Sequence, residues 1–252
     1  MKHAIIKIIS AFWNSVLRLI AYGPWPRFLH QAIIRNYNRI YSIKWDDTSD
    51  FKNLGDFFLR HVDFPLGKST LVSPAEALLL DGPRPVSESM KGIRIKGLDY
   101  RWNEFPEWKP EFEKATYWNL YLAPPDYHWV HAPCDGLNVR AIRFPGMKVP
   151  VNALGRMLVP SLYLLNERLS FQWQHPELGQ CWLAMVGAIG VSRIRSSVGE
   201  VGTTWTSVDD FKKGQKLGGF ELGSSALLVV ERPGKTFDGL KKLRPGIDLI
   251  YS

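Results

Sequence analysis

Short apolar segments separated by glycine and proline fill most of this 252-residue chain after about residue 70. Short runs rich in β-branched and aromatic residues are typical of strands, and glycine and proline mark the turns between them. The expected strands cover residues 70–72, 78–80, 93–95, 118–122, 137–144, 169–173, 181–186, 191–195 and 226–231. We therefore expect a β-rich body of mainly antiparallel sheet, with one short helical segment within residues 153–168.

Helical patterns precede this body. Apolar residues recur at helical spacing over residues 4–20, and the sequence Gly-Pro-Trp-Pro at 23–26 ends that segment. A second helical pattern runs over residues 27–41, and a short third helix is expected at residues 53–60. The predicted fold class is therefore α+β, with N-terminal amphipathic helices followed by the strands.

The positive charge of the chain is concentrated in its first 45 residues. That segment contains seven basic residues and no acidic residue, whereas the whole chain has a net charge of only +8. The seven are Lys2, Lys7, Arg18, Arg27, Arg35, Arg39 and Lys44. Basic amphipathic helices that also carry Trp and Tyr are typical of segments that lie on an anionic membrane surface.

This charge pattern divides the chain into two parts. We expect residues 1–45 to associate with a membrane and residues 46–252 to form the second domain; the alternative is that both helices simply pack on the body. No apolar stretch reaches the ~20 residues that a transmembrane helix needs, so none is expected. Lys7 interrupts the first apolar run and no small-residue cleavage site follows it, so no signal peptide is expected either.

The two cysteines, Cys134 and Cys181, are too few for a disulfide framework. Neither belongs to a Cys-x-x-Cys or Cys/His spacing of the kind that binds zinc, so free thiols in a reducing compartment are expected and no metal site. No nucleic-acid partner is expected.

Two polar segments are candidates for chemistry, and each is ambiguous by itself. His128 and His131 lie three residues apart in a proline-rich stretch, where two structural histidines are an equally good interpretation. Leu222-Gly223-Ser224 interrupts an apolar stretch, but Gly-Ser pairs are also common in hairpin turns. The pattern is not Gly-x-Ser-x-Gly, so it does not indicate a hydrolase nucleophile.

Taken together and in their order, these and other segments resemble the phosphatidylserine decarboxylase family, in its bacterial membrane-associated branch. The segments are DFFLR at 56–60, VSPAE at 72–76, IKGLDY at 95–100, LYLAP at 120–124, DYHWVHAPC at 126–134, FPG at 144–146, NER at 166–168, VGA at 186–188 and KG at 213–214 leading to LGSS at 222–225. They span nearly the whole chain, and the Asp-Tyr-His-x-Val-His-x-Pro-Cys stretch is highly specific.

The resemblance implies a self-processing carboxy-lyase. In the family, the serine that matches Ser224 attacks the preceding carbonyl, which leaves a β chain ending at Gly223 and an α chain that begins with a pyruvoyl group made from Ser224. That pyruvoyl cofactor acts as an electron sink while phosphatidylserine is converted to phosphatidylethanolamine and CO₂. The resemblance also implies peripheral attachment to the cytoplasmic face of the bacterial inner membrane, contact with anionic phospholipid, and a homodimer.

Residue roles follow from the same resemblance. His131 matches the catalytic histidine that takes the serine proton, and His128 matches the one associated with proton transfer during decarboxylation, with a purely structural role as the alternative. The family's Pro-Ala-Asp-Gly motif is Pro74-Ala75-Glu76-Ala77 here, so the carboxylate that would orient His131 is Glu76, longer by one methylene.

The change at Glu76 leaves a second interpretation open. The chain could be a cleavage-impaired family member that binds phospholipid at the membrane without turnover. A third interpretation keeps the pyruvoyl chemistry but acts on another amine-bearing substrate.

Overall fold

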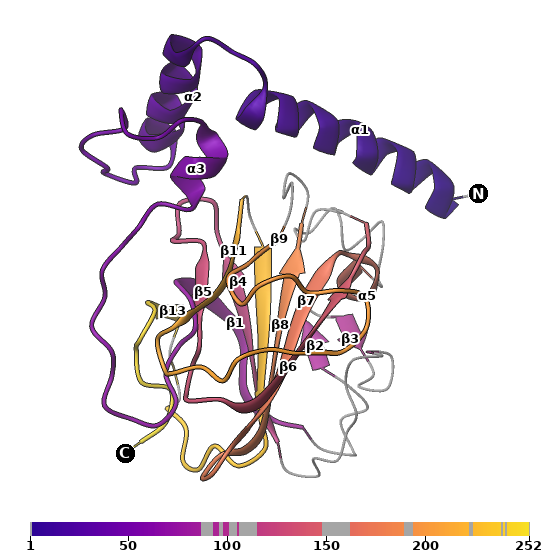
Figure 1. The fold of residues 1–252 in the computed structure, drawn as a ribbon, viewed down its shortest axis with the longest axis vertical. Coiled ribbons are helices and arrows are strands. Elements are labelled where there is room, and N and C mark those ends of the chain that lie inside the picture. Colours follow the sequence, from indigo (N-terminus) through magenta and orange to yellow (C-terminus); the bar gives the residue numbers. More distant parts are fainter. Residues whose placement is uncertain are drawn as a thin grey trace.

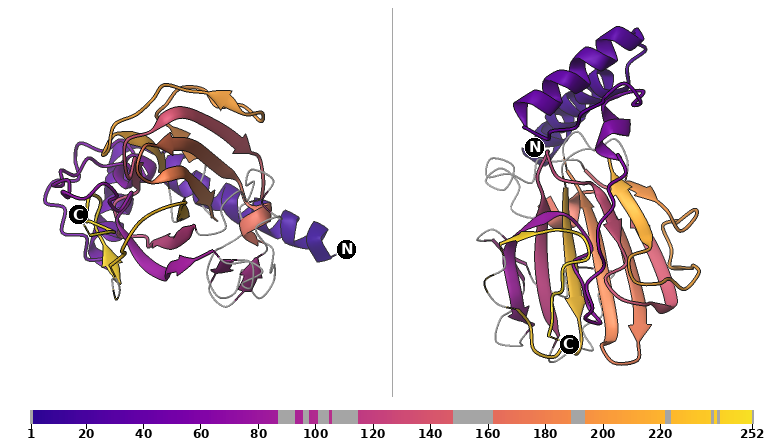
Figure 2. Two further views of the ribbon diagram at one scale, coloured as in Figure 1. Left: turned by 90° about the horizontal axis from the view of Figure 1, so that it is seen from below. Right: turned by 90° about the vertical axis from the view of Figure 1, so that its left-hand side faces the viewer.

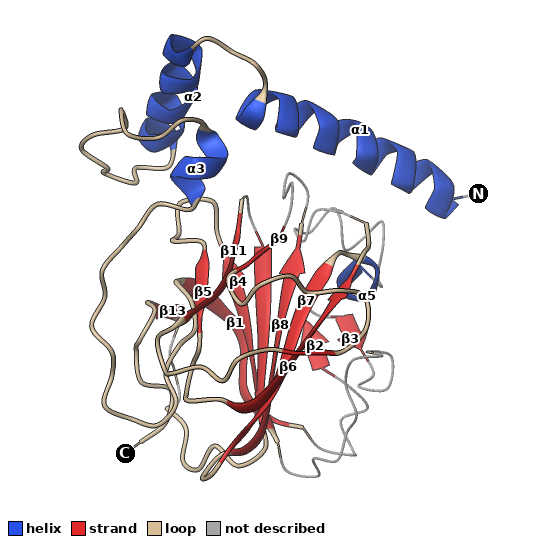
Figure 3. Ribbon diagram, viewed as in Figure 1, coloured by secondary structure: helices blue, strands red, loops and turns tan. Residues whose placement is uncertain are grey.

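The three N-terminal helices gather at one end of the molecule and the strands form a body below them (Figure 1; Figure 3). The computed structural model describes residues 2–86, 93–95, 98–100, 105, 115–147, 162–188, 194–221, 224–237, 239 and 241–251. N-terminal helices followed by antiparallel sheet confirm the predicted α+β class.

The N-terminal helices are α1 (Lys2–Tyr22), α2 (Arg27–Ile40) and α3 (Leu54–Phe58). Pro26 precedes the first turn of α2, where a missing N–H costs nothing, and the side chain of Asn53 caps α3 by accepting the N–H of Asp56 (3.0 Å). Side chains from all three helices form a small core separate from that of the body: Ala21, Ile34, Leu54, Phe57 and Phe58. In the described part of the chain, no helix is long and apolar enough to cross a membrane.

A short helix in the body, α5 (Leu162–Leu165), falls within the segment predicted at residues 153–168. Residues 153–161 of that prediction lie outside the described residues. The prediction of one short helix in this segment is confirmed, and strand β7 follows it from Arg168.

The strands are β1 (Ala77–Pro85), β2 (Ile93–Ile95), β3 (Leu98–Tyr100), β4 (Thr116–Leu122), β5 (Trp129–His131), β6 (Leu137–Phe144), β7 (Arg168–His175), β8 (Gly179–Gly187), β9 (Ile194–Ser196), β10 (Thr206–Ser207), β11 (Lys216–Phe220), β12 (Ser224–Val230) and β13 (Lys242–Leu243). Eight of them form one sheet in the order β10-β6-β7-β8-β12-β4-β1-β13. The other sheets are β5-β11-β9 and β2-β3. The large sheet is strongly curved, as Figure 2 shows in the view from below.

Most predicted strands are present, and the exceptions have physical reasons. Residues 70–72 make only an isolated bridge between Val72 and Asp248, and residues 191–193 of the strand predicted at 191–195 lie outside the described residues. The missed strands are β3, β5, β10, β11 and β13. Four of these have two or three residues, and β11 contains Gly218-Gly219, so none carries a clear alternating pattern.

Strand β12 lies at the centre of the large sheet. Each of its seven residues pairs with β4 on one side and β8 on the other, and all seven are buried. Burial on both faces explains its unbroken apolar sequence after Ser225. Within the small sheet, a Cβ on Gly218 of β11 would lie 2.4 Å from the backbone oxygen of Arg195 in β9, so glycine is needed where these two strands meet.

The central position of β12 gives a stability prediction. Replacing the buried Leu228 of β12 with Ala should lower the free energy of unfolding by about 2–5 kcal/mol, because the substitution leaves a cavity in the core. Leu137 of β6 is 42% exposed, so Leu137→Ala is the matched control and should cost clearly less. Denaturant unfolding of the two variants measures both values, and equal losses would contradict the central role of β12.

Candidate active site

The two candidate histidines follow a tight turn at residues 123–126. Asp126 closes this turn: its N–H donates to the carbonyl of Ala123 (2.9 Å), and its carboxylate accepts the N–H of Ala123 (2.8 Å). The two prolines between them have fixed φ and no N–H to satisfy, which suits a turn. His128 comes directly before β5 and His131 is its last residue, so the turn and the strand together fix both rings.

His128 is fully buried beside the helices, with its ring 4.7 Å from that of Phe58 on α3. Its Nδ1 lies 2.7 Å from the backbone carbonyl of Asp126 and must therefore carry the proton. The opposite nitrogen, Nε2, is an acceptor that has no hydrogen-bond partner among the described residues. Burial lowers the pKa of His128 to about 3, so the ring is neutral at physiological pH and holds an available lone pair.

His131 is also held as a neutral ring. Its Nδ1 donates to the carbonyl of Gly214 (2.8 Å), which leaves Nε2 to accept the hydroxyl of Tyr127 (3.1 Å). The ring of Phe64 packs edge-on against it at 4.7 Å. Burial lowers the pKa of His131 to about 4, outweighing the bond to Gly214. The ring can act as a base through Nε2 once the Tyr127 hydroxyl turns away, because that nitrogen has a single lone pair.

Ser224 is the first residue of β12, opposite Leu122 of β4 and Gly187 of β8. It is completely buried, and its hydroxyl has no hydrogen-bond partner within the part of the chain that the structure describes. The predicted cleavage partner Gly223 and its neighbour Leu222 lie outside the described residues. A buried hydroxyl without a partner is energetically costly, which marks Ser224 as a candidate for chemistry.

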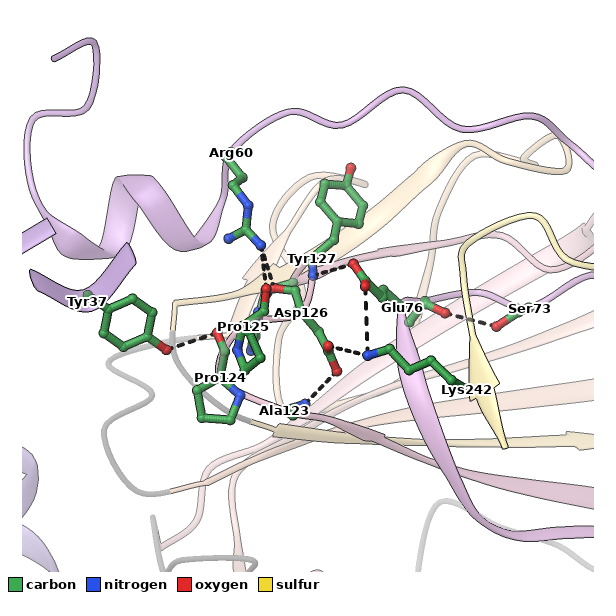
Figure 4. A network of polar contacts seen from close by, with 12 residues as sticks. Tyr37, Arg60, Ser73, Glu76, Ala123, Pro124, Pro125, Asp126, Tyr127 and Lys242 are labelled. Atoms are coloured by element: carbon green, nitrogen blue, oxygen red, sulfur yellow. Dashed lines mark hydrogen bonds and ion pairs between the residues drawn. The ribbon is translucent and has the colours of Figure 1, made fainter. Parts of the chain in front are cut away.

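Glu76 lies beside the histidine segment, because the N–H of His131 donates to the carbonyl of Pro74 (2.8 Å). Its carboxylate accepts the backbone N–H of Tyr127 (2.9 Å) and lies 3.7 Å from the ammonium of Lys242 (Figure 4). The ring nitrogens of His131 are bonded to Gly214 and Tyr127, so Glu76 acts here on the backbone of the turn. The assignment of Glu76 as the residue that orients the His131 ring stays a prediction.

The segments that carry the candidate residues converge at the helical end of the body. Strand β5 pairs with β11, and the N–H of Phe220 donates to the carbonyl of His128 (3.0 Å). Because β11 ends at Phe220, it leads within four residues to Ser224. The fold therefore brings together Glu76, His128, His131 and the segment before Ser224, which are distant in sequence.

The N-terminal helices contact this region directly. At the end of α1, the hydroxyl of Tyr22 donates to the carboxylate of Glu221 (2.6 Å), three residues before Ser224. Glu221 also pairs with the guanidinium of Arg195 (2.6 Å). These bonds tie the segment before β12 to α1 and to β9.

Two further contacts join the helices to the turn (Figure 4). Tyr37 of α2 donates to the carbonyl of Pro124 (2.9 Å), and Arg60, just after α3, donates to the carbonyls of Pro125 (2.7 Å) and Asp126 (3.0 Å). Arg60 is almost fully buried, and burial lowers its pKa. The Asp126 carbonyl therefore accepts from Arg60 and His128 together.

Sequence reasoning missed several residues of this site: Tyr22, Arg60, Asp126, Tyr127, Glu221 and Lys242. Arg60, Asp126 and Tyr127 lie within segments that carried the family resemblance, so the motif contained them without indicating what they contact. Lys242 and Glu221 carried no local signal, since their partners are far away in sequence.

A sequence profile described as phosphatidylserine decarboxylase matches residues 54–245, about three quarters of the chain. The chain belongs to the phosphatidylserine decarboxylase family. This confirms the family, and the enzyme class that it implies, as predicted from the segments.

Curated relatives agree over most of both chains. The phosphatidylserine decarboxylase proenzyme of Campylobacter jejuni is 29% identical over 84% of this chain and 87% of its own length. That of Myxococcus xanthus is 29% identical over 89% of this chain and 87% of its own. That of Brevibacillus brevis is 29% identical over 82% and 80%. The match in length supports comparison of the whole chain with these proenzymes.

The low pKa of the histidines gives a prediction for acid stability. In the unfolded state His131 binds a proton near its ordinary pKa of about 6.5, whereas the folded state excludes that proton until about pH 4. The contribution of His131 to the free energy of unfolding should therefore be present above pH 6.5 and fall as the pH drops toward 4.

Denaturant unfolding at pH 7.5 to 4.5 tests this point in uncleaved Ser224→Ala protein. Adding His131→Gln should make the pH dependence shallower across that range. An unchanged pH dependence would show that His131 is not held neutral by the fold.

Proposed function

We propose that this protein is a self-processing, pyruvoyl-dependent phosphatidylserine decarboxylase that produces phosphatidylethanolamine and CO₂. The observation that carries the proposal is the fully buried hydroxyl of Ser224, which has no partner among the described residues, at the position that matches the family's processing serine. A structural serine at this depth would be expected to have a partner. Its isolation favours a chemical role.

The neutral state of His131 suits the first step. The hydroxyl of Ser224 attacks the carbonyl carbon of Gly223, its proton goes to a basic nitrogen, and the amide becomes an ester. On His131 that nitrogen is Nε2, because Nδ1–H is bonded to the Gly214 carbonyl. Loss of the α-proton of Ser224 to a base then breaks its Cβ–Oγ bond, which releases the Gly223 carboxylate and leaves a dehydroalanine at the start of the α chain. This enamine tautomerises to an imine, and water replaces its nitrogen as ammonia to give the pyruvoyl group.

The position of Ser224 fits the cofactor that it would become. Backbone pairing with Leu122 and Gly187 would hold the new N-terminus of the α chain in a fully buried place. When present, the pyruvoyl group supplies an electron sink for loss of CO₂. His128 is itself fully buried and holds a proton-accepting Nε2, so it is suited to move a proton there.

One observation favours a second candidate function. The carboxylate of Glu76 is bonded to the Tyr127 N–H and paired with Lys242, while the Nδ1 of His131 is bonded to the Gly214 carbonyl. A triad in which a carboxylate stabilises protonated His131 would need a different arrangement. The second candidate is therefore an uncleaved family member that binds phospholipid at the membrane.

Intact-mass measurement of purified protein separates the two candidates. The enzyme should give two fragments divided between Gly223 and Ser224, with the smaller one blocked by a pyruvoyl group. Ser224→Ala removes the nucleophile and should remain one chain, whereas Ser225→Ala keeps it and is the control. A wild-type protein that stays uncut at 28.8 kDa would rule out the self-processing enzyme.

We also propose that the N-terminal helices attach the protein to the cytoplasmic face of the inner membrane. Anionic lipids there, including phosphatidylserine, would attract the basic residues of these helices. The buried positions of α1 include Ser10, Asn14 and Ala21, while large apolar side chains of both helices face outward. Among the described side chains, those most exposed are Phe12, Trp13, Leu19, Phe28 and Ile40. Such an outward apolar surface with basic neighbours suits the lipid interface. The homodimer stays a prediction.

Flotation with liposomes tests the membrane surface. The double substitution Phe12→Ser and Trp13→Ser should reduce binding to phosphatidylserine-containing vesicles by about tenfold or more, because two large side chains leave the interface. Leu137→Ser removes a comparably exposed side chain from the body and should bind normally. Full binding by the double variant would contradict the assignment of this surface.

A further inference from the structure

Lys242 joins two carboxylates that lie far from it in sequence (Figure 4). It belongs to the short strand β13, where it pairs with Leu78 at the start of β1. Its ammonium forms a hydrogen-bonded ion pair with the carboxylate of Asp126 and lies 3.7 Å from that of Glu76. A single cation therefore connects the edge of the large sheet to the turn before the histidines.

Asp126 depends on this cation. The residue is only 3% exposed, and burial raises the pKa of its carboxyl group, while the hydrogen bond and charge of Lys242 lower it. Removing one partner of such a pair leaves an uncompensated charge in a buried place. Six titratable or charged groups act on Asp126 or share its site: Lys242, Glu76, Arg60, Tyr37, Tyr121 and His128.

One chain of contacts runs from Lys242 through Asp126 to His128. The carboxylate of Asp126 binds Lys242 on one oxygen and the N–H of Ala123 on the other, which closes the turn. The backbone carbonyl of the same Asp126 accepts the Nδ1–H of His128. The position of Asp126 therefore decides where the free Nε2 of His128 points.

A second chain of contacts runs from Lys242 through Glu76 and Tyr127 to His131. Glu76, beside Lys242, accepts the backbone N–H of Tyr127 (2.9 Å). The hydroxyl of Tyr127 in turn donates to Nε2 of His131 (3.1 Å). Lys242 thus faces the two carboxylates through which both histidine rings are held.

We propose that Lys242 is a positioning residue for self-processing, which fixes His128 and His131 through the Asp126 and Glu76 carboxylates. The inference rests on the proposed function. Lys242 follows Ser224 in the chain, whereas Glu76 and Asp126 precede Ser224. After cleavage, the contacts of Lys242 with these carboxylates would therefore join the α chain to the β chain beside the histidines.

Substitutions of Lys242 test its positioning role, and substitution of the neighbouring Lys241 is the control. Lys242→Met should slow self-processing by about tenfold or more, because small displacements of catalytic groups have effects of this size. Lys242→Arg keeps the cation and should recover most of the rate. Lys241→Met is the matched control, since the Lys241 side chain is exposed and, among the residues that the structure describes, only its backbone carbonyl is used, by Leu79. The fraction of cut chain over time measures each rate.

The pH profile of processing distinguishes positioning from a purely structural effect. Without Lys242, the pKa of Asp126 rises further, and that of His128 also rises, since Lys242 lowers both. Self-processing proceeds at pH values above these pKa values, and its rate falls as the pH drops through them. The acid limb of the profile should therefore move to higher pH in Lys242→Met, while Lys241→Met keeps the wild-type limb.

Chemical rescue covers the case in which Lys242→Met does not fold. Lys242 is nearly half exposed, whereas the native cysteines Cys134 and Cys181 are fully buried. In Lys242→Cys protein, 2-bromoethylamine should therefore modify the new thiol and regenerate an ammonium at nearly the same place. Processing should resume after this treatment, and Lys241→Cys should show no change.

The outcomes separate this inference from the proposed function. If wild-type protein is never cut, the proposed function fails and the inference fails with it. If wild-type protein is cut, but Lys242→Met is cut equally fast with the same acid limb, the inference alone is overturned. Failure of 2-bromoethylamine to restore processing in modified Lys242→Cys protein would also overturn it.

Discussion

The Asp126 residue is the point on which the arrangement of the site depends. Its backbone carbonyl accepts from both Arg60 and His128, and its carboxylate closes the turn and binds Lys242. A single residue thus connects the helices, the histidine segment and the edge of the large sheet. Because Asp126 is almost completely buried, each of these bonds compensates for solvation that it has lost. Loss of any one affects the others, so the site behaves as a unit.

The N-terminal helices present two different faces. Their outer face carries large apolar side chains, and their inner face holds the site: Phe58 packs on His128, Tyr37 binds the turn, and Tyr22 binds Glu221 just before β12. The same helices that carry the surface proposed to meet lipid therefore also contact the histidine segment.

The sequence allowed the class of fold, most strands and the main candidate residues to be predicted, because those depend on local patterns and on specific motifs. His128, His131, Ser224 and Glu76 all came from such segments. What the chain could not reveal were contacts across long separations: Lys242 binds Asp126 across 116 residues. No periodicity or spacing encodes that pairing, which exists only because β13 closes on β1. The Glu76 contact to the Tyr127 backbone was missed for the same reason.

The place of β12 has a consequence for the two-chain form of the protein. A strand bonded on both sides within a closed core cannot leave without unfolding its neighbours β4 and β8. The two chains of a cleaved molecule would therefore not obey an ordinary association equilibrium. They would remain together on dilution, would not exchange with chains from other molecules, and could not be reassembled simply by mixing separately made halves. Synthesis as one continuous precursor is the direct way to place this strand in the middle of the sheet.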